Sequence, residues 1–441
     1  MASVQRERTP QFNMPRRSQQ PGGQLPKNKH CRYANANIPV QAEPHKDESF
    51  SARQAKNPGK SAIYRHGRKR RVSESHEGLH PVARKKRTKS EGELLMTKSV
   101  RAGPLSELKS LTEERSLERL THQIWDDYLI TRQVPQRYEQ KLHLRDYLLS
   151  IFRTAYPGCS LHICGSTCSG LATNASDIDL CLLLSETREI DQRFEARRIL
   201  HQLNCMLKRS AYIQKCRVIH AKVPILKFRD SKSGCECDVN INNTVGIKNT
   251  HLLQGYCGYD WRVPSLIMII KKWAKRHRIN DASQGTLSSY SLVMMVLHYL
   301  QEPCQPPVVP SLQMTYPEIF NGSRNIHDLA LENPSIRIAR PLKSGNQETL
   351  GELLVGFFRY YAEQFRWEKD VISVRQGKKY SKGDSRVWYN KFICIEEPFD
   401  LSCVTRAVHK QEKFDSICQR FKIAYYTLTV SPFLESIMSG S

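Results

Sequence analysis

One stretch of the sequence carries most of the information about its fold and chemistry: GSTCSGLATNASDIDLCLLL, residues 165–184. It begins with a Gly-Ser pair and ends with Asp177-Ile178-Asp179 running into an apolar strand. Residues i and i+2 of a strand project from the same face, so the two carboxylates can converge on shared cations while Ile178 packs behind them. Hard oxygen ligands of this kind suit Mg²⁺, which keeps several waters and binds through a few carboxylates and substrate phosphates. The pattern predicts a metal site at the start of a buried strand.

A third carboxylate follows later in the chain. In Cys237-Asp-Val-Asn-Ile241, Asp238 interrupts an otherwise apolar strand, so it can join Asp177 and Asp179 from a neighbouring strand. Three carboxylates can hold two divalent cations, with Asp238 beside the cation nearest the attacking hydroxyl, as two-metal phosphoryl transfer requires. A lone Asp-x-Asp pair is also typical of a surface turn or helix cap. The strand, the Gly-Ser pair and Asp238 together favour a site for Mg²⁺ or Mn²⁺.

The Gly-Ser pair itself is expected to bind phosphate. Gly165 and Ser166 precede an expected helix start, where backbone N–H groups and a serine hydroxyl can contact the β- and γ-phosphates of a nucleotide. Gly-Ser alone is a weak indication, and its weight comes from the carboxylates that follow.

Residues 1–104 are predicted to be a disordered basic tail, because they are rich in Gln, Pro, Ser, Arg and Lys and lack apolar periodicity. Residues 1–100 hold 22 Lys and Arg against 8 Asp and Glu, while the whole chain holds 68 against 43. This excess favours an anionic partner such as nucleic acid. Two basic clusters, 65–71 and 84–89, are typical of nuclear-import signals or RNA contacts, and equally of merely solvated charge.

Beyond the tail, the apolar pattern alternates between helical and strand periods. A helix is expected from Thr112, a capping-type residue, through Leu129. The other elements expected in the first half are a helix over 140–156, strands over 161–164, 179–184, 223–228 and 237–241, and a helix over 193–209. After Trp261 the chain is mostly helical, with helices expected over 265–277, 288–301 and 349–365. Past Tyr426 the sequence indicates little.

The cysteines and the apolar runs restrict the setting. Fourteen cysteines without a CxxC pair indicate reduced thiols in the cytosol or nucleus, with a zinc site as the alternative. The longest apolar runs are shorter than the roughly 20 residues that a membrane-spanning helix needs. We therefore expect a soluble protein with no membrane partner.

The pattern of Gly165-Ser166, Asp177-x-Asp179 and Asp238 resembles the signature of the DNA-polymerase-β-like nucleotidyltransferases. Within that superfamily, later motifs look like those of the cytoplasmic poly(A) polymerases and terminal uridylyltransferases, and are most like the germline-development type. These motifs are NNTVGIKNT (242–250), KKWAK (271–275), GTLSSY (285–290) and EEPFD (396–400). The resemblance covers roughly residues 105–425.

The resemblance implies an α+β fold in which a nucleotidyltransferase catalytic domain is inserted into a helical central and PAP-associated domain. The expected divisions are a disordered tail over 1–104, a helical segment of the central domain over 105–140, the catalytic domain over 141–259, the helical central and PAP-associated domain over 260–428, and a tail over 429–441. The nucleotide would lie in the cleft between the catalytic and helical domains.

The resemblance also implies roles for residues around that cleft. In relatives, the residue matching Gly246 lies against the nucleotide, those matching Asn249 and Thr250 contact its ribose, those matching Lys271, Lys275 and Ser289 contact the triphosphate, and the one matching Tyr290 stacks on the base. The local chemistry agrees, because two lysines at i and i+4 share one helix face and offset triphosphate charge. Taken alone, the lysines could be a solvated face, Tyr290 a core residue and Asn249-Thr250 a helix cap.

The expected activity is the template-independent addition of AMP from ATP to RNA 3′ ends, which elongates the poly(A) tails of cytoplasmic RNAs. Terminal uridylyl transfer is the rival. Relatives that prefer UTP carry His three residues beyond the acid matching Asp400, whereas this chain has Cys403, which is only a weak donor toward a base edge. ATP is therefore favoured. A catalytically inactive RNA-binding scaffold is less expected, because the three carboxylates and Ser166 are all present.

No RNA-recognition motif, KH loop or zinc-finger spacing is evident, so the chain shows no module for choosing a particular RNA. The expected partners are the RNA 3′ end and an RNA-binding protein that supplies specificity. The expected location is the cytoplasm, with the nucleus as a second possibility.

Overall fold

The computed structural model describes residues 104–184, 190–331, 344–383 and 385–439, and these belong to one compact unit. The predicted tail, apart from residue 104, lies outside the described residues, as do the two basic clusters at 65–71 and 84–89. Among the described residues, no helix combines the length and the apolar character that crossing a bilayer requires.

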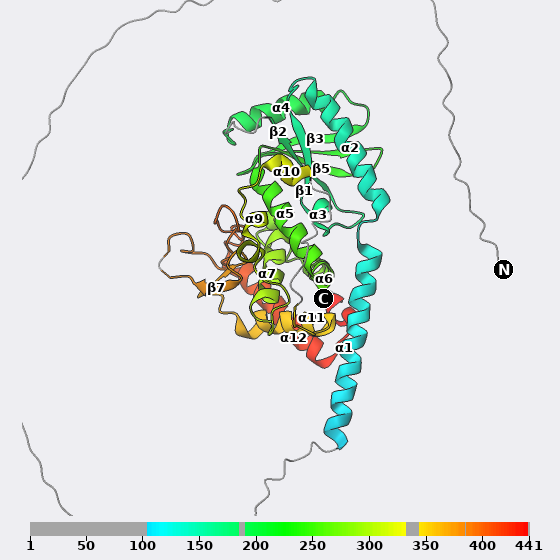
Figure 1. The fold of residues 1–441 in the computed structure, drawn as a ribbon, viewed down its shortest axis with the longest axis vertical. Coiled ribbons are helices and arrows are strands. Elements are labelled where there is room, and N and C mark those ends of the chain that lie inside the picture. Colours follow the sequence, from blue (N-terminus) through cyan, green and yellow to red (C-terminus); the bar gives the residue numbers. More distant parts are fainter. Residues whose placement is uncertain (1–103, 185–189, 332–343, 384, 440–441) are drawn as a thin grey trace, which may run out of the picture. The chain divides into compact units, whose positions relative to one another are not determined.

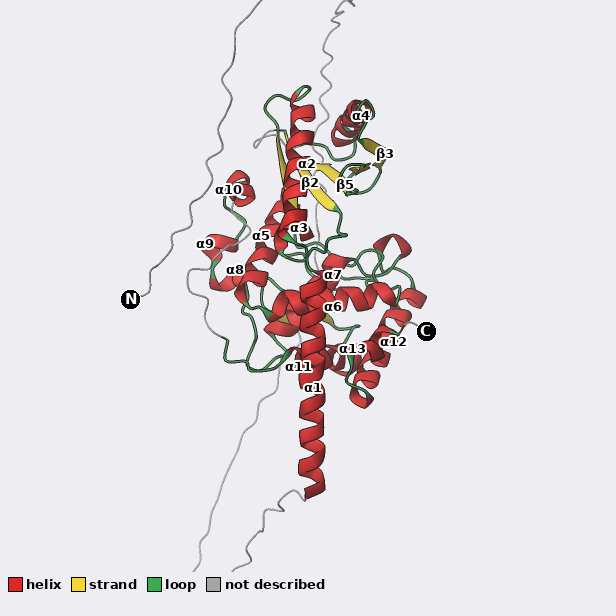
Figure 2. Cartoon of the chain, turned by 90° about the vertical axis from the view of Figure 1, so that its right-hand side faces the viewer, coloured by secondary structure: helices red, strands yellow, loops and turns green. Residues whose placement is uncertain are grey.

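A five-stranded mixed sheet forms the part of the chain that carries the predicted carboxylates (Figure 2). Its strands are β1 (Ser160–Cys164), β2 (Ile178–Leu183), β3 (Ile213–Ile219), β4 (Ile225–Asp230) and β5 (Glu236–Ile241), in the order β1-β2-β5-β4-β3. The central pair, β2 and β5, runs parallel, whereas the other pairs are antiparallel. Because β2 and β5 are parallel, both strands begin at the same end of the sheet.

The two faces of this sheet are covered by different helices, and the strand period decides which residues face which helices. On one face Ile178, Leu180 and Leu182 of β2 join a core with α2 (Pro135–Arg153) and α4 (Glu195–Leu207). On the other face the alternate residues Cys181 and Leu183 pack with Ile247 of α5 (Thr244–Tyr259) and Leu329 of α10 (Ile326–Leu331). Asp179 alternates along β2 in step with Cys181 and Leu183, so its side chain is on this second face.

The remaining helices build a second, larger core that lies on the α5 side of the sheet (Figure 1). The longer members are α1 (Pro104–Thr131), α6 (Arg262–Arg276), α7 (Ser289–Gln301), α11 (Leu350–Arg359) and α12 (Gln411–Val430). Short elements that contribute to this core are α8 (Leu312–Thr315), α9 (Pro317–Phe320), η2 (Tyr360–Gln364), α13 (Leu434–Met438) and β6 (Asp370–Ser373), which pairs with β7 (Lys378–Ser381). The short helix α3 (Ser166–Ser169) packs against β1, β2 and α5 instead, and the single turn η1 (Ala282–Gln284) precedes α7. Aromatic rings join the helices at its centre, where Trp273 of α6 meets Phe358 of α11 and Phe421 of α12 at ring-centroid distances of 4.6 and 5.1 Å.

The predicted fold class, a catalytic sheet domain combined with a helical domain, is confirmed, and several element predictions need correction. Thr112 does not cap a helix, because α1 already begins at Pro104. The expected division at residue 140 falls inside α2, whose buried face packs on the sheet. The expected helix over 349–365 is α11, begun by a Thr349–Glu352 capping box, followed by the π-helix η2.

Strand β3 and helix α13 are among the elements that were not expected. Strand β3 lies at the edge of the sheet, is interrupted by a bulge and exposes several polar residues, so its sequence lacks a clear alternation. The end of the chain, expected to be a tail from residue 429, instead forms α13. Its Leu434 and Ile437 are buried, and the Leu434 N–H donates to Gln123 Oε1 of α1 at 2.8 Å. A helix of five residues is too short to produce a helical period in the sequence.

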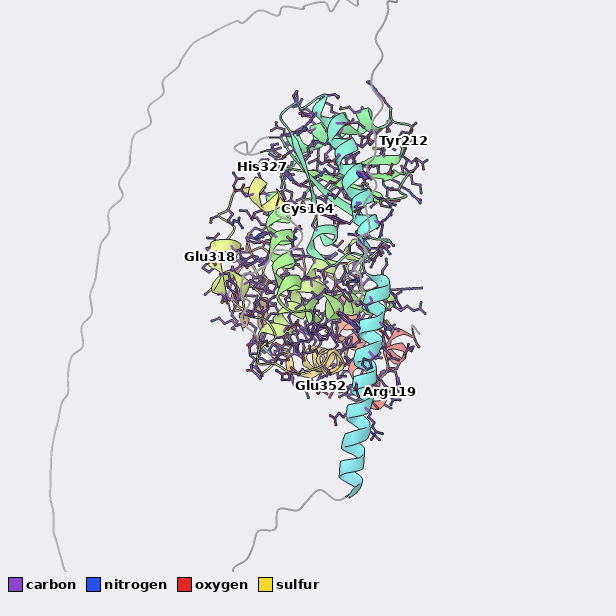
Figure 3. The ribbon with its side chains drawn as sticks, turned by 45° about the vertical axis from the view of Figure 1, so that its right-hand side comes forward. Arg119, Cys164, Tyr212, Glu318, His327 and Glu352 are labelled. Atoms are coloured by element: carbon purple, nitrogen blue, oxygen red, sulfur yellow. The ribbon has the colours of Figure 1, made fainter. Side chains whose placement is uncertain are left out.

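Helices α1 and α11 pack at very short range, and Figure 3 shows Arg119 of α1 at the level of Glu352 of α11. The Gly351 N–H donates to Thr121 Oγ1 at 2.9 Å. A Cβ atom on Gly351 would overlap the Leu117 carbonyl oxygen of α1. The absence of a side chain at this position therefore sets how closely the two helices approach.

We predict that Gly351→Ala lowers the free energy of unfolding by about 1–2 kcal/mol, because overpacking against the α1 backbone outweighs the better helix propensity of alanine. Denaturant unfolding of the two proteins measures the difference. Gly158→Ala is the matched control, since a Cβ there meets no atom within 4 Å, and we expect a change within about 0.5 kcal/mol. Equal stability of Gly351→Ala and the parent would show that α1 can move away from α11 at no cost.

Candidate active site

The parallel pairing of β2 with β5 brings two of the three predicted carboxylates together. In the register of the two strands, Asp179 is the partner of Asp238. Directly paired residues on neighbouring strands have Cβ atoms about 5 Å apart. Asp177 directly precedes β2, and Ile178 is fully buried behind it. The structure therefore places all three carboxylates at the end of the sheet where β2 and β5 begin, on the face that α5 covers.

A lysine from the neighbouring strand β4 lies among these carboxylates. Lys227 Nζ is 3.1 Å from Asp238 Oδ1 and 3.6 Å from Asp177 Oδ2. Burial lowers the pKa of Lys227, but the Asp238 carboxylate outweighs it and the net pKa is raised. The ammonium group offsets part of the repulsion among the carboxylates. The sequence reasoning missed Lys227, although it stands directly opposite Asp238 in the antiparallel register of β4 and β5.

Two of the carboxylates, Asp179 and Asp238, hold protons more tightly than usual. Burial, together with the nearby Asp238 and Asp177, raises the pKa of Asp179 to about 6. Burial also raises the pKa of Asp238, although Lys227 opposes the change. Within the described ranges, no three His, Cys, Asp or Glu side chains form a closed metal shell. The donor set still fits a hard divalent cation, since three carboxylates that lie close together provide the oxygen ligands that such a cation prefers.

The Gly-Ser turn packs directly against this cluster. Gly165 has a φ of 67°, and a Cβ there would overlap Asp179 Oδ2, so both the backbone conformation and the space require glycine. Its N–H donates to Thr250 Oγ1 at 2.8 Å, and that hydroxyl donates to the Gly246 carbonyl at 2.7 Å. In this structure Thr250 and Gly246 therefore support the turn from within α5. Neither is at a helix cap, and the ribose contact expected of Thr250 stays a prediction.

A second lysine supports the same cluster from behind. Lys141 of α2 is fully buried, and its Nζ donates to Thr167 Oγ1 at 3.0 Å and toward the Asp177 carbonyl at 3.5 Å. Burial lowers its pKa, and the Asp179 and Asp177 charges oppose that shift. Sequence reasoning missed Lys141, although it occupies the buried helix face of Leu144 and Leu148, where an apolar residue is expected.

A cavity of about 580 Å³ opens beside the carboxylates and collects side chains from distant parts of the chain. The predicted residues that line it are Gly165, Ser166, Asp177, Asp179, Lys271, Lys275, Ser289 and Tyr290. Asp127, Lys272 and Asn280 also line it and were not predicted, and the Lys272 ammonium forms an ion pair with Asp127. The volume lies within the roughly 300–1,000 Å³ of small-molecule sites.

The helical side of the cavity presents positive charge and an aromatic ring. Lys271 Nζ donates to the Leu171 carbonyl at 3.3 Å, and burial lowers its pKa. Ser289 Oγ donates to Asn280 Oδ1 at 3.1 Å. The Tyr290 hydroxyl donates to Asn249 Oδ1 at 2.8 Å, and Glu397 Oε1 lies 3.4 Å from the same hydroxyl. Asn249 is not among the residues that line the cavity, but it accepts a hydrogen bond from Tyr290, which does line it.

The end of the EEPFD motif is arranged differently from the prediction. Asp400 is exposed, and its Oδ1 accepts the Ser402 N–H at 2.9 Å. Cys403 is only 5% exposed and packs with Val371, Trp388 and Cys394, with its Sγ 3.4 Å from Thr405 Oγ1. The structure thus brings Glu397 toward the cavity and buries Cys403 in a separate apolar cluster. Strand register, which the motif alone does not reveal, decides this difference: Cys403 is bridged to Glu396.

Comparisons with known proteins agree with this geometry. The model of the central palm domain of mitochondrial-like poly(A) RNA polymerase matches residues 120–258, and the model of the Cid1 family poly A polymerase matches residues 349–403. The poly(A) RNA polymerase GLD2 of Rattus norvegicus is 42% identical over 341 residues, which cover 76% of this chain and 69% of that protein. GLD2-A of Xenopus laevis is 44% identical over 322 residues, covering 73% and 62%.

Solved structures show the same relationship. The GLD-2/RNP-8 complex matches with a TM-score of 0.65 and 35% identity, covering 73% of this chain and 98% of that chain. The Cid1 poly(U) polymerase with bound MgGTP matches with a TM-score of 0.61 and 29% identity, covering 73% and 98%.

Paired carboxylates on parallel strands beside a Gly-Ser turn, facing a lysine-lined cavity, define a polymerase-type nucleotidyltransferase, a class that uses nucleotide substrates and divalent metal. The chain belongs to the GLD2-type family of poly(A) RNA polymerases. It is an RNA adenylyltransferase. The family, the fold and the template-independent poly(A) activity that the sequence predicted are confirmed.

We predict that Asp179→Asn stabilises the metal-free protein near pH 7.5. A pKa raised above the unfolded value means that stability from this group is present at low pH and is lost as pH rises through about 6. Removing the charge should therefore add on the order of 1 kcal/mol at pH 7.5, after solvent screening of a partly exposed group.

The gain should shrink as the pH falls from about 6 toward 4, where the parent carboxyl protonates. Thermal unfolding in EDTA at several pH values measures it. Asp146→Asn, which changes an exposed carboxylate on α2, is the control and should be nearly neutral. A variant that is less stable than the parent at pH 7.5 would contradict the assigned repulsion.

We also predict that Cys403→His lowers the free energy of unfolding by about 1–3 kcal/mol, because an imidazole overfills the cluster around Cys403. The ATP/UTP ratio of kcat/KM should stay within about threefold of the parent. Cys205→His, at an exposed cysteine, is the control for the substitution itself. A large shift toward UTP would show that Cys403 faces the base in the nucleotide-bound enzyme.

Proposed function

We propose that this chain transfers AMP from ATP to the 3′-hydroxyl of RNA in the cavity between β2, α6 and α7. The observation that carries the proposal is the pairing of Asp179 with Asp238 beside a cavity. Lys271 and Lys275 line the same cavity. Carboxylates on one wall and ammonium groups on the other suit a substrate that is a metal-bound triphosphate. The same arrangement favours a charged substrate over a neutral one.

Asp177, Asp179 and Asp238 would hold one or two Mg²⁺ or Mn²⁺ ions. Bound there, the cations would lower the pKa of the attacking hydroxyl and offset the charge of the departing pyrophosphate. Lys227 already neutralises part of the carboxylate charge from the side of β4, at 3.1 Å from Asp238. It would keep Asp238 in place while the neighbouring carboxylates contact the cation.

The remaining side chains would position the nucleotide. Gly165 and Ser166 line the cavity next to the carboxylates, where they can contact the outer phosphates. Lys271 and Lys275 would offset triphosphate charge from α6. Tyr290, held by Asn249 and Glu397, would present its ring to the base. Fixing the hydroxyl of Tyr290 from two sides orients the ring before the nucleotide arrives, which lowers the entropic cost of binding.

We propose ATP as the preferred nucleotide, because the relatives with the higher identity are poly(A) polymerases. Uridylyl transfer is the alternative, and the Cid1 poly(U) polymerase structures at 27–29% identity favour it. The position of Cys403 in this structure supports neither base directly. Incubation of the full chain with each of the four nucleoside triphosphates and an oligo(A) primer decides between them.

We further propose that an RNA-binding protein chooses the RNA and that the chain acts in the cytoplasm, with the nucleus as a second site. The solved GLD-2 structures contain RNP-8 or GLD-3 alongside GLD-2. No sequence motif for choosing an RNA is evident in this chain. Affinity capture of the tagged chain from cells, followed by identification of bound proteins and imaging, tests both statements.

We predict that Asp177→Asn and Asp179→Asn each reduce AMP incorporation by about a hundredfold or more, because each loss removes a charged ligand that acts on the reacting groups. Primer extension with Mg²⁺ and ATP measures the rate, and isothermal titration with Mn²⁺ measures metal binding without catalysis. Asp146→Asn should match the parent in both assays. Extension near the parental rate by either active-site variant would refute the assignment of these carboxylates.

A further inference from the structure

A second cavity, of about 700 Å³, lies beyond β7 in the helical part of the protein, and the mechanism above does not use it. β7 is labelled in Figure 1. The lining residues that matter here are Lys382, Trp388, Tyr389, Lys391, Phe392 and His409. We call this cavity the upstream pocket. It combines aromatic rings with basic side chains, which is the composition of surfaces that bind single-stranded nucleic acid.

The aromatic residues of the upstream pocket divide into two groups. Trp388 is only 4% exposed and packs in the apolar cluster around Cys403, and Phe392 stacks on Phe414 of α12 with an interplanar angle of 16°. These two rings serve the core. Tyr389, by contrast, is 74% exposed. Core packing does not explain a large aromatic ring in this position, whereas stacking on a nucleobase does.

Two of the basic residues that line the upstream pocket, Lys382 and His409, interact with backbone carbonyls. Lys382 Nζ donates to the Lys391 carbonyl at 2.5 Å, which ties the two ends of the segment after β7 together. The imidazole of His409 interacts through Nδ1 with the Ala407 carbonyl at 2.7 Å, so Nε2 is the nitrogen that can meet a ligand. Two ammonium groups and an imidazole beside a flat ring suit a phosphate and a base of one strand.

Two short connections join the upstream pocket to the active site. The chain runs from Lys391 to Glu397, which contacts Tyr290, so six residues span at most about 20 Å between them. On the other side, the Ala407 carbonyl that contacts His409 lies against Gly285. The turn at Gly285 leads directly into Ser289 and Tyr290, which line the active-site cavity.

We propose that the upstream pocket binds the RNA strand several nucleotides before its 3′ end, with the base stacked on Tyr389 and the backbone phosphates near Lys382 and Lys391. This inference rests on the proposed function, since it places the substrate of the same reaction. Stacked nucleotides rise about 3.4 Å each, so 20 Å corresponds to roughly six of them. At most about six nucleotides are therefore needed to cover this span, and a primer of roughly three nucleotides is the short substrate for the test, because the proposal places the base on Tyr389 more than three nucleotides before the 3′ end.

The test compares the full chain with Tyr389→Ala, Tyr389→Phe and Tyr426→Ala. Tyr426 is a matched control, since it is 55% exposed and lies on α12, where its hydroxyl bonds Glu363. Fluorescence anisotropy gives the Kd of a labelled oligo(A) of roughly 15 nucleotides without ATP, and of one of roughly three nucleotides. We expect Tyr389→Ala to raise the Kd of the longer RNA about 5- to 100-fold, with Tyr389→Phe and Tyr426→Ala near the parent.

Neither the Kd of the short RNA nor the KM for ATP should change in Tyr389→Ala. In addition, Lys391→Gln should reduce the slope of log Kd against log salt by about one phosphate contact for the longer RNA only. An unchanged Kd for the longer RNA in Tyr389→Ala would overturn the proposal. If that variant also lost a protein partner in affinity capture, the pocket would instead be a protein-binding surface. Equal weakening of the short and the long RNA would also overturn it. Failure of the proposed function would show separately, as a parent that binds RNA but incorporates no AMP.

Discussion

The repulsion between Asp179 and Asp238, held as register partners on neighbouring parallel strands, is the constraint on which the rest of the structure depends. Burial and the neighbouring carboxylates both raise the pKa of Asp179, which shows that its charged form is disfavoured in the metal-free protein. The fold tolerates this cost because Lys227 and Lys141 place positive charge on two sides of the cluster. Because a bound divalent cation would relieve the same repulsion, the proposed metal binding and the charge repulsion have one origin.

The sheet alone would leave these carboxylates at an open edge. The α5 helix closes one side, and its Thr250 fixes the Gly165 turn against Asp179. The α6 and α7 helices then bring lysines, a serine and a tyrosine to the opposite wall of the cavity. Asp177 and Asp179 line one wall and Lys271 and Lys275 the other, and a triphosphate with its metal is the kind of ligand that can interact with both.

Hydrogen bonds carry this arrangement beyond the cavity. Tyr290 is tied to Asn249 on α5 and to Glu397, and the neighbouring Glu396 accepts hydrogen bonds from Ser373 and Arg375 in the region of β6 and β7. Tyr290 is therefore connected with the hairpin beyond which the upstream pocket lies. Buried, fully bonded networks of this kind hold side chains in one orientation.

The sequence by itself determined the chemistry of this protein, and the tertiary structure decided how that chemistry is assembled. The strand after Asp177, the Gly-Ser pair and the helical period of Lys271 and Lys275 are local patterns, and local backbone geometry is enough to interpret them. Lys141, Lys227 and Glu397 could not be identified in this way, because each acts on a residue that is distant in the sequence. Only packing shows that Lys141 lies behind Asp177 or that Lys227 faces Asp238 across a strand pair.

The position of Cys403 illustrates the same limit. The resemblance to related enzymes implied that the residue three beyond Asp400 faces the base, whereas in this structure Cys403 is bridged to Glu396 and its side chain lies in an apolar cluster. A shift of one residue in a strand reverses the face to which a side chain points. Spacing along the chain therefore predicts which residues gather near a site, whereas strand register and helix packing decide which of them face it.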